Sequence, residues 1–150
     1  MKILIEVPSW LGDAVMVTPA IETLLSQFDE PEVTLVGSFG SVELLKNHPK
    51  VIKVSILKKN FFSLFKIAKN LGHFDVYFSF RTSLRAKFFK ILISSNLKYQ
   101  FVNDKNQNIH QVKKYNDFIN ESLSINTSPG KLIIHRDINI KKEVFGLYRS

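Results

Sequence analysis

The chain has 150 residues, no cysteine and a formal net charge of +8, and 45% of its residues are hydrophobic. This length and composition are typical of one globular domain with a hydrophobic core. The lack of cysteine excludes disulfides, a thiol nucleophile and a thiolate metal site. No apolar stretch approaches the length of a membrane span, and the N-terminal apolar run is too short for a secretory signal. We therefore expect a cytoplasmic protein whose basic surface favours phosphate-rich or anionic partners.

The first residues predict a strand followed directly by a helix. Residues 2–7 are a β-branched and aliphatic run that indicates a buried strand, and Pro8 and Ser9 end it. Gly12 allows a tight turn, and Asp13 opens a helical pattern. Asp13 should thus lie at the carboxyl edge of a sheet, where it can cap the helix, act on a ligand, or do both. The apolar face of this helix is expected to carry Ala14, Val17, Ile21, Leu24, Leu25 and Phe28.

A second strand is predicted over residues 32–36, and a glycine-rich turn follows it. Gly37 and Gly40 are typical of a plain turn, although glycines at a strand end also let a phosphate or sugar approach the backbone. Ser41 is positioned to cap a short helix over residues 42–47.

The third predicted strand covers residues 51–57 and ends at Lys58 and Lys59, which either are solvated or extend into a cleft. Asn60 can cap the next helix and Gly72 can end it. Lysines flank the apolar stripe of this helix. Packing on the sheet explains the stripe most simply, and resting on a membrane surface is the alternative. The stripe consists of Phe61, Leu64, Phe65, Ala68 and Leu71.

The fourth predicted strand, residues 74–80, leads into a basic helix start. Thr82 or Ser83 can cap this helix, and Arg81 and Arg85 flank the cap. Amides at a helix start, a hydroxyl and guanidinium groups can together bind an anion; alternatively, the arginines are surface charges beside a cap. The apolar side of the helix is predicted to consist of Leu84, Phe88, Ile91 and Leu92.

The last elements are a fifth strand over residues 97–102, a polar loop, and a helix that Asn108 opens together with Gln111. His110 at this helix start can contact a substrate, pack, or face water. The four histidines are expected to be isolated from one another, so that no metal site is predicted.

Five strand–helix alternations predict an α/β fold, a Rossmann-like doubly wound parallel sheet. We expect this domain to span residues 1–125. Residues 126–150 are expected to be a linker and the start of a second domain, with an extended segment over 131–140.

The string from Pro8 to Met16, PSWLGDAVM, resembles the opening of the lipopolysaccharide heptosyltransferases, and most closely the heptosyltransferase II branch. Ser-Leu-Arg at 83–85 resembles a second landmark of that family, and residues 110–115 resemble its His-x-Val-x-x-Tyr segment. The resemblance implies the N-terminal half of a GT-B glycosyltransferase with Asp13 as general base. The substrate-binding residues predicted with it are Ser9, Trp10, Gly12, Ser83, Arg85, Arg81, Lys58 and His110.

The implied reaction transfers heptose from ADP-heptose to the inner core of lipopolysaccharide or lipooligosaccharide, with inversion and without cofactor or metal. The chain stops at Ser150, before the family's donor-binding residues, and we expect it to hold only the acceptor side. Peripheral contact with the cytoplasmic face of the inner membrane is a further expectation, and nucleic acid is not an expected partner. Two alternatives remain: a truncated or split acceptor-binding module without activity of its own, and a basic nucleotide- or nucleic-acid-binding α/β domain, which needs an aromatic and basic surface strip.

Overall fold

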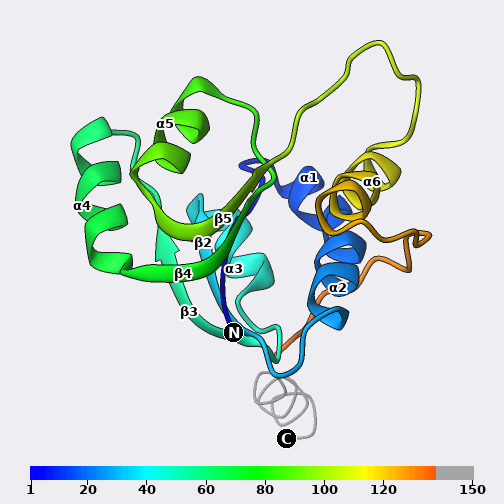
Figure 1. Ribbon diagram of the computed structural model, residues 1–150, viewed down its shortest axis with the longest axis horizontal. Helices are drawn as coiled ribbons and strands as arrows, with labels where there is room; N and C mark the ends of the chain where they lie inside the picture. Colours follow the sequence, from blue (N-terminus) through cyan, green and yellow to red (C-terminus); the bar gives the residue numbers. More distant parts are fainter. Residues whose placement is uncertain (138–150) are drawn as a thin grey trace, which may run out of the picture.

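The computed structural model describes residues 1–137. Its centre is a parallel five-stranded sheet with strand order β3-β2-β1-β4-β5 (Figure 1). The predicted doubly wound α/β fold is confirmed, and within these residues no helix is long and apolar enough to span a membrane. The elements are β1 (Lys2–Glu6), α1 (Leu11–Met16), α2 (Thr18–Ser26), β2 (Glu32–Gly37), α3 (Phe39–Leu45), β3 (Val51–Ile56), α4 (Phe61–Leu71), β4 (His73–Ser79), α5 (Leu84–Leu92), β5 (Ser94–Gln100) and α6 (Gln111–Leu123).

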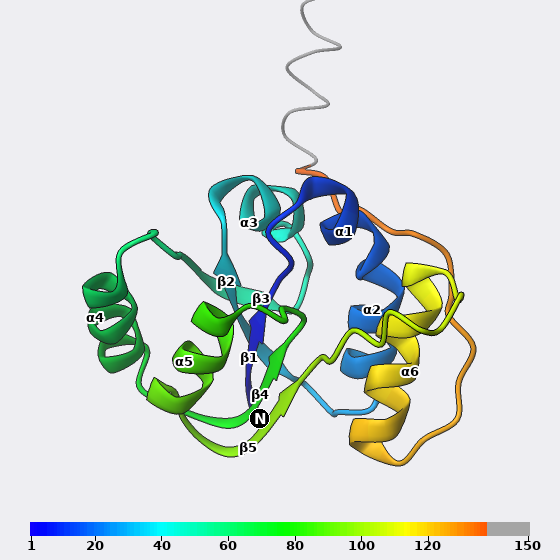
Figure 2. The same cartoon turned by 90° about the horizontal axis from the view of Figure 1, so that it is seen from above.

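Helices cover both faces of the sheet. α1, α2, α3 and α6 lie on one face, and α4 and α5 lie on the other (Figure 2). Alternate residues of β1 serve the two sides: Ile3 and Ile5 belong to the core beneath the four helices, whereas Leu4 packs in the core beneath α4 and α5. A central strand buried on both faces is therefore apolar almost throughout, as the sequence predicted.

The first helix begins earlier than predicted. Trp10 is the N-cap of α1, so that Gly12 and Asp13 lie within the first turn. The predictions of an N-cap at Asp13 and of a tight turn at Gly12 are therefore wrong. A Cβ added at Gly12 would meet no atom within 4 Å, and thus no steric reason requires glycine there.

The predicted long helix is in fact two, which join at Val17. Pro19 has no N–H with which to continue the α1 ladder to the Val15 carbonyl. Instead, the Thr18 hydroxyl donates a hydrogen bond of 2.8 Å to the Val15 carbonyl. The Val15 carbonyl thus keeps a hydrogen-bond partner where the new helix starts.

Helix α3 also starts earlier than predicted, directly after Ser38, and Ser41 is buried inside it and does not cap it. The glycines beside it serve close packing. A Cβ at Gly37 would lie 2.6 Å from the Val7 side chain. The Ser38 hydroxyl donates to the backbone oxygen of Ser9 at 3.0 Å, which fixes the loop after β1 against α3.

On the other face, the caps of α4 are as predicted: the Asn60 side chain accepts from the Phe62 N–H, and Gly72 ends the helix with φ of 80°. The predicted apolar face of α5 is wrong except for Leu92, which packs against the core. Leu84, Phe88 and Ile91 point to solvent, whereas Ala86, Phe89 and Ile93 reach the core. The stripe of α4 is likewise divided, because Leu64 and Ala68 are buried but Phe61 and Phe65 are exposed.

Helix α6 starts at Gln111, and its cap is His110, whose ring accepts from the Val112 N–H, rather than the predicted Asn108. Residues 125–137 then run back along α6 and α2 (Figure 1). The Asn120 side chain accepts from the Thr127 backbone and hydroxyl. Residues 138–150, with the rest of the predicted extended segment and the expected start of a second domain, lie outside the described residues.

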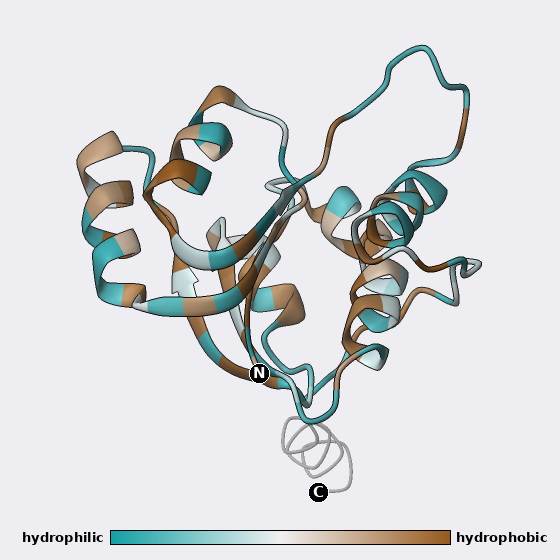
Figure 3. Ribbon diagram, in the orientation of Figure 1, coloured by the Kyte–Doolittle hydropathy of each residue, from teal (hydrophilic) through white to brown (hydrophobic). Residues whose placement is uncertain are grey.

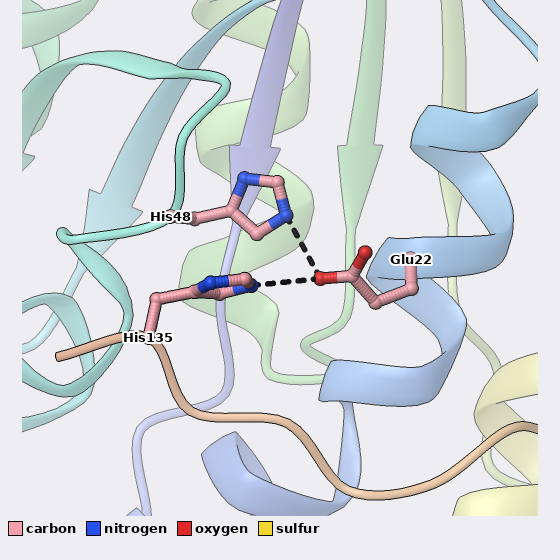
Figure 4. Close-up of side chains that lie close together, drawn as sticks. All are labelled: Glu22, His48 and His135. Atoms are coloured by element: carbon pink, nitrogen blue, oxygen red, sulfur yellow. Dashed lines mark hydrogen bonds and ion pairs between the residues drawn. The ribbon is translucent and has the colours of Figure 1, made fainter.

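Two histidines and a glutamate attach this returning segment to α2 (Figure 4). The Nε2 atoms of His48 and His135 lie 2.8 and 3.2 Å from the same carboxylate oxygen of Glu22, and the two rings meet edge to face. The prediction that the histidines are isolated is therefore wrong. The Nδ1 atom of His48 accepts from the Lys50 N–H, so that a neutral His48 ring donates to Glu22 through Nε2. Metal binding through Nε2 of His48 requires the other tautomer, with the proton on Nδ1, where the Lys50 N–H already donates. We call Glu22, His48 and His135 the Glu22 clamp.

Candidate functional site

A polar pocket of about 460 Å³ lies at the carboxyl ends of β1, β4 and β5. Open α/β sheets bind ligands at this edge, because the loops that follow neighbouring strands converge there. Its lining comes from the loops after all three strands together with α1 and α6. The lining residues are Pro8, Ser9, Trp10, Asp13, Phe80, Arg81, Thr82, Ser83, Phe101, Asn103, Gln111 and Tyr115.

Asp13 presents its carboxylate to this pocket. It lies in the first turn of α1, where the helix dipole favours negative charge. Within residues 1–137 its carboxylate accepts no hydrogen bond, and the side chain is partly exposed. This carboxylate is therefore available to a ligand.

Tyr115 comes from α6, lines the same pocket and interacts electrostatically with Asp13. Its ring packs between Phe80 and Phe101, with centroid distances of 5.6 and 4.9 Å. Burial, and then the charge of Asp13, raise the pKa of Tyr115 to about 12, although a hydrogen bond with Gln111 acts in the opposite direction. At neutral pH the phenol thus keeps its proton and can donate it in a hydrogen bond.

A buried carboxylate holds Arg81 at the edge of the pocket. Glu6, at the end of β1, is wholly buried and accepts hydrogen bonds from the hydroxyls of Tyr77 and Ser79. Arg81 Nη1 donates to the other oxygen of Glu6 at 3.3 Å. Burial raises the pKa of Glu6, whereas Tyr77, Arg81 and Ser79 all act to lower it.

The backbone of Arg81 is fixed as well as its side chain. Its N–H donates to the Ser79 hydroxyl at 3.3 Å, and its carbonyl accepts from the Gln100 amide at 3.1 Å. Residues of β1, β4 and β5 thus all position one guanidinium group, which can bind an anionic ligand.

The helix start beyond Arg81 is partly as predicted. The Ser83 hydroxyl accepts from the Ala86 N–H at 3.1 Å and is therefore the cap of α5. Arg85 follows in the first turn, and its Nε and Nη2 atoms are buried without a hydrogen-bond partner in the described part of the chain. Burial and the charge of Arg81 lower the pKa of Arg85, against an opposing effect of Glu6.

The structure brings together five of the predicted site residues and leaves four outside the pocket. Ser9, Trp10, Asp13, Arg81 and Ser83 all line it. The residues that do not line it are Gly12, Lys58, Arg85 and His110. Of these four, Lys58 is exposed after β3, a strand at the far edge of the sheet, and His110 caps α6.

Sequence reasoning missed Glu6, Gln111 and Tyr115 as site residues. Glu6 had one signal, since a carboxylate at the end of an apolar strand needs partners when that strand is buried. Gln111 and Tyr115 are spaced i, i+4 and so lie on one face of α6, next to the pocket. The other missed lining residues are Pro8, Phe80, Thr82, Phe101 and Asn103.

Comparison with known proteins finds matches to curated relatives and to solved structures, but none to a family model. Two lipooligosaccharide heptosyltransferases 2 from Campylobacter jejuni subsp. jejuni do match: one, from serotype O:2, is 39% identical over 129 residues, and the other, from serotype O:6, is 34% identical over 157 residues. These matches cover 83% and 98% of this chain but only 40% and 49% of the relatives, so that the chain spans about half of their length.

Solved structures show the same arrangement. A glycosyl transferase family 9 protein from Veillonella parvula superposes with a TM-score of 0.80, and the ADP-heptose lipopolysaccharide heptosyltransferase II of E. coli with 0.72, each at 16% identity. Each match covers 99% of this chain and about half of the other, 48% and 50%. These likenesses confirm the predicted Rossmann-like fold, and the sequence matches confirm the predicted resemblance to the heptosyltransferases.

Proposed function

We propose that this chain, a relative of the lipooligosaccharide heptosyltransferases, forms the acceptor-binding side of a heptosyltransferase. The reaction is transfer of heptose from ADP-heptose to the inner core of lipopolysaccharide or lipooligosaccharide. The observation that carries the proposal is the Asp13 carboxylate, which has no partner among residues 1–137 and faces a polar pocket at the edge where such sheets bind ligands.

In the proposed reaction Asp13 is the general base. It accepts the proton of the acceptor hydroxyl while that oxygen forms a bond to the anomeric carbon of heptose. The bond from that carbon to the diphosphate oxygen breaks on the opposite side, which inverts the configuration, and ADP leaves with the bonding electrons. Asp13 lies in the first turn of α1, from which its side chain reaches the pocket.

Other lining groups orient the acceptor. The Tyr115 phenol, protonated at neutral pH, donates a hydrogen bond beside Asp13. Arg81, held by Glu6, binds a phosphate or carboxylate of the acceptor core, since guanidinium groups bind such anions with two parallel hydrogen bonds. Arg85 adds positive charge behind Arg81, and we keep it in the proposal as a residue that supports anion binding.

The chain alone is proposed to bind the acceptor without turning it over. Much of the rate of a group transfer comes from holding both reactants together, and the relatives are about twice as long as this chain. A split or truncated acceptor-binding module therefore remains the second candidate. A cytoplasmic location with peripheral contact to the inner membrane follows from a lipid-linked acceptor and belongs to the same proposal.

The Asp13→Asn variant tests the role of the base. It nearly preserves size and removes the proton acceptor, and we expect transfer by the complete enzyme to fall by at least about 1,000-fold while acceptor binding is retained. Asp29→Asn, which changes an exposed carboxylate elsewhere, is the matched control and should behave as the wild type. Near-normal turnover of Asp13→Asn excludes Asp13 as the base.

A further inference from the structure

The outer surface of α4 and α5 carries large apolar side chains that nothing in residues 1–137 covers. Phe62 is 83% exposed, Leu84 82% and Ile91 75%. Isolated exposed apolar residues are ordinary, but a contiguous group of them marks a surface that binds something. The α4–α5 face, as we call it, consists of Phe61, Phe62, Phe65, Leu84, Phe88 and Ile91.

These side chains form one surface rather than two. The rings of Phe61 on α4 and Phe88 on α5 meet edge to face at 5.5 Å. The two helices lie side by side on the outside of the sheet (Figures 1 and 2), and Figure 3 shows apolar residues along both. Their inner sides already fill the core with Leu64 and Phe89. The outer apolar residues are therefore additional to what the fold requires.

The surroundings of this face are strongly basic. Residues 57–93 contain a single acidic residue, Asp75, and it accepts a hydrogen bond from the Lys2 N–H at the amino end of the sheet. Within the described chain none of the lysines of α4 or α5 forms an ion pair. The basic residues of this stretch are Lys58, Lys59, Lys66, Lys69, Arg81, Arg85, Lys87 and Lys90.

We propose that the α4–α5 face docks on the surface of a bilayer that contains anionic phospholipids. Phenylalanine, leucine and isoleucine can enter the boundary between headgroups and acyl chains, while the lysine ammonium groups extend to the phosphates. A second copy of the chain fits this face poorly, because two such faces would bring lysines against lysines. A nucleic acid fits only part of this face: its phenylalanines offer rings for base stacking, but Leu84 and Ile91, two of its three most exposed side chains, offer none.

The position of the face agrees with a lipid-bound substrate, and this step rests on the proposed function. Ser83 lines the pocket, and the next residue, Leu84, belongs to the α4–α5 face. Both helices begin at the carboxyl edge of the sheet, where Asp13 also lies. Docking through these helices keeps the pocket close to the headgroup layer, where the sugar of a membrane-anchored acceptor is found.

The test measures sedimentation of the 150-residue chain with vesicles that contain no glycolipid acceptor, so that the result does not depend on the proposed activity. Vesicles of phosphatidylcholine with phosphatidylglycerol should bind the chain, vesicles of phosphatidylcholine alone should bind it at least 10-fold less, and added salt should weaken binding. The double variant Phe62→Asp/Ile91→Asp should lose at least 10-fold in affinity for the anionic vesicles.

Controls separate docking from folding and from catalysis. Val102→Asp alters a side chain that is 81% exposed on another part of the surface, and it should bind as the wild type does. Asp13→Asn should also bind vesicles normally. The two aspartates of the double variant lie on exposed positions, and circular dichroism must show that its fold is retained.

Several outcomes overturn the proposal. Wild-type chain that stays in the supernatant with anionic vesicles excludes lipid docking. Equal loss of binding in Val102→Asp and in the double variant shows that the α4–α5 face is not the contact. A concentration-dependent dimer that the double variant abolishes, without vesicle binding, assigns the face to a second copy, and salt-sensitive oligonucleotide binding without vesicle binding assigns it to nucleic acid.

Discussion

The guanidinium group of Arg81 lies with Nη1 3.3 Å from Oε1 of Glu6, a carboxylate with no exposed surface. A charged group that is buried at the end of β1 therefore fixes an arginine at the edge of the pocket. The pair links the interior of the sheet to the candidate site, and its charge state depends on pH.

Glu6→Gln tests this dependence, because it removes the charge of Glu6 and keeps its shape. Burial raises the pKa of Glu6 above its ordinary 4.5, so that the folded state holds this proton more tightly than the unfolded chain does. The stability that Glu6 contributes is thus fully present below pH 4.5 and is lost as the pH rises through the folded pKa.

We expect the free energy of unfolding of the wild type to increase relative to that of Glu6→Gln as the pH falls from neutral to about 5, by about 1.4 kcal/mol for each unit of pKa difference. Urea denaturation of both proteins at each pH measures this. If the two pH profiles run parallel, Glu6 does not titrate as its burial indicates.

Tyr115→Phe tests the donor beside Asp13. The variant keeps the ring contacts with Phe80 and Phe101 and removes only the hydroxyl. We expect the free energy of unfolding to change by less than about 1 kcal/mol and the transfer rate of the complete enzyme to fall about 10-fold or more. Tyr99→Phe is the control, because Tyr99 stacks on Phe78 away from the pocket. Full activity of Tyr115→Phe would show that its hydroxyl makes no useful contact.

A pair of glycine variants tests the packing of α3. Gly37→Ala places a Cβ 2.6 Å from the Val7 side chain, and we expect a loss of about 1–3 kcal/mol in the free energy of unfolding. Gly12→Ala adds a methyl group in open space within α1, and we expect a gain of up to about 1 kcal/mol. Thermal or chemical denaturation measures both changes. A stable Gly37→Ala protein would mean that β2 and the loop after β1 can move apart.

The Glu22 clamp predicts acid sensitivity. Burial lowers the pKa of His48 below its ordinary 6.5, with smaller effects of His135 and Lys50 in the same direction, while Glu22 raises it. The unfolded chain therefore takes up the His48 proton first, and the free energy of unfolding decreases as the pH falls through 6.5 toward the folded pKa.

His48→Gln should remove this part of the pH dependence, whereas His73→Gln, which alters a histidine bonded to Ser94 and Asn96, should retain it. Denaturation between neutral pH and about pH 5 distinguishes the two variants. An unchanged acid slope in His48→Gln would place the sensitive group elsewhere.

The sequence predicted the existence of all five strands, because the first four are short β-branched or aromatic runs whose ends carry turn residues. The fifth, predicted over residues 97–102, lies earlier in the structure, at Ser94–Gln100, because its first residues carry no such signal. Asn60 and Gly72 were predicted correctly as helix ends because their chemistry is local: an amide that bonds the first turn and a glycine that tolerates positive φ. Trp10 could not be predicted as a helix start in this way, because its side chain makes no capping hydrogen bond to the first turn of α1.

The wrong face of α5 has a different cause. Leu84, Phe88 and Ile91 repeat with the helical period, but so do Ala86, Phe89 and Ile93, and periodicity cannot tell which set meets the sheet. Sequence reasoning therefore discounted an aromatic and basic surface strip that the structure does contain. The partners of Glu6 and of His48 were also beyond sequence reasoning, because they arise from pairings between segments far apart in the chain.

The strand order has a consequence for synthesis of the protein. β1, β2 and β3 are adjacent in the sheet and leave the ribosome first, so that three of its five strands have been synthesised by Ile56. Among residues 1–137, however, every side-chain partner of Glu6 comes from the stretch Tyr77 to Arg81. Until β4 emerges, the Glu6 carboxylate remains hydrated at the open edge of the nascent sheet, where its charge opposes premature pairing with another strand.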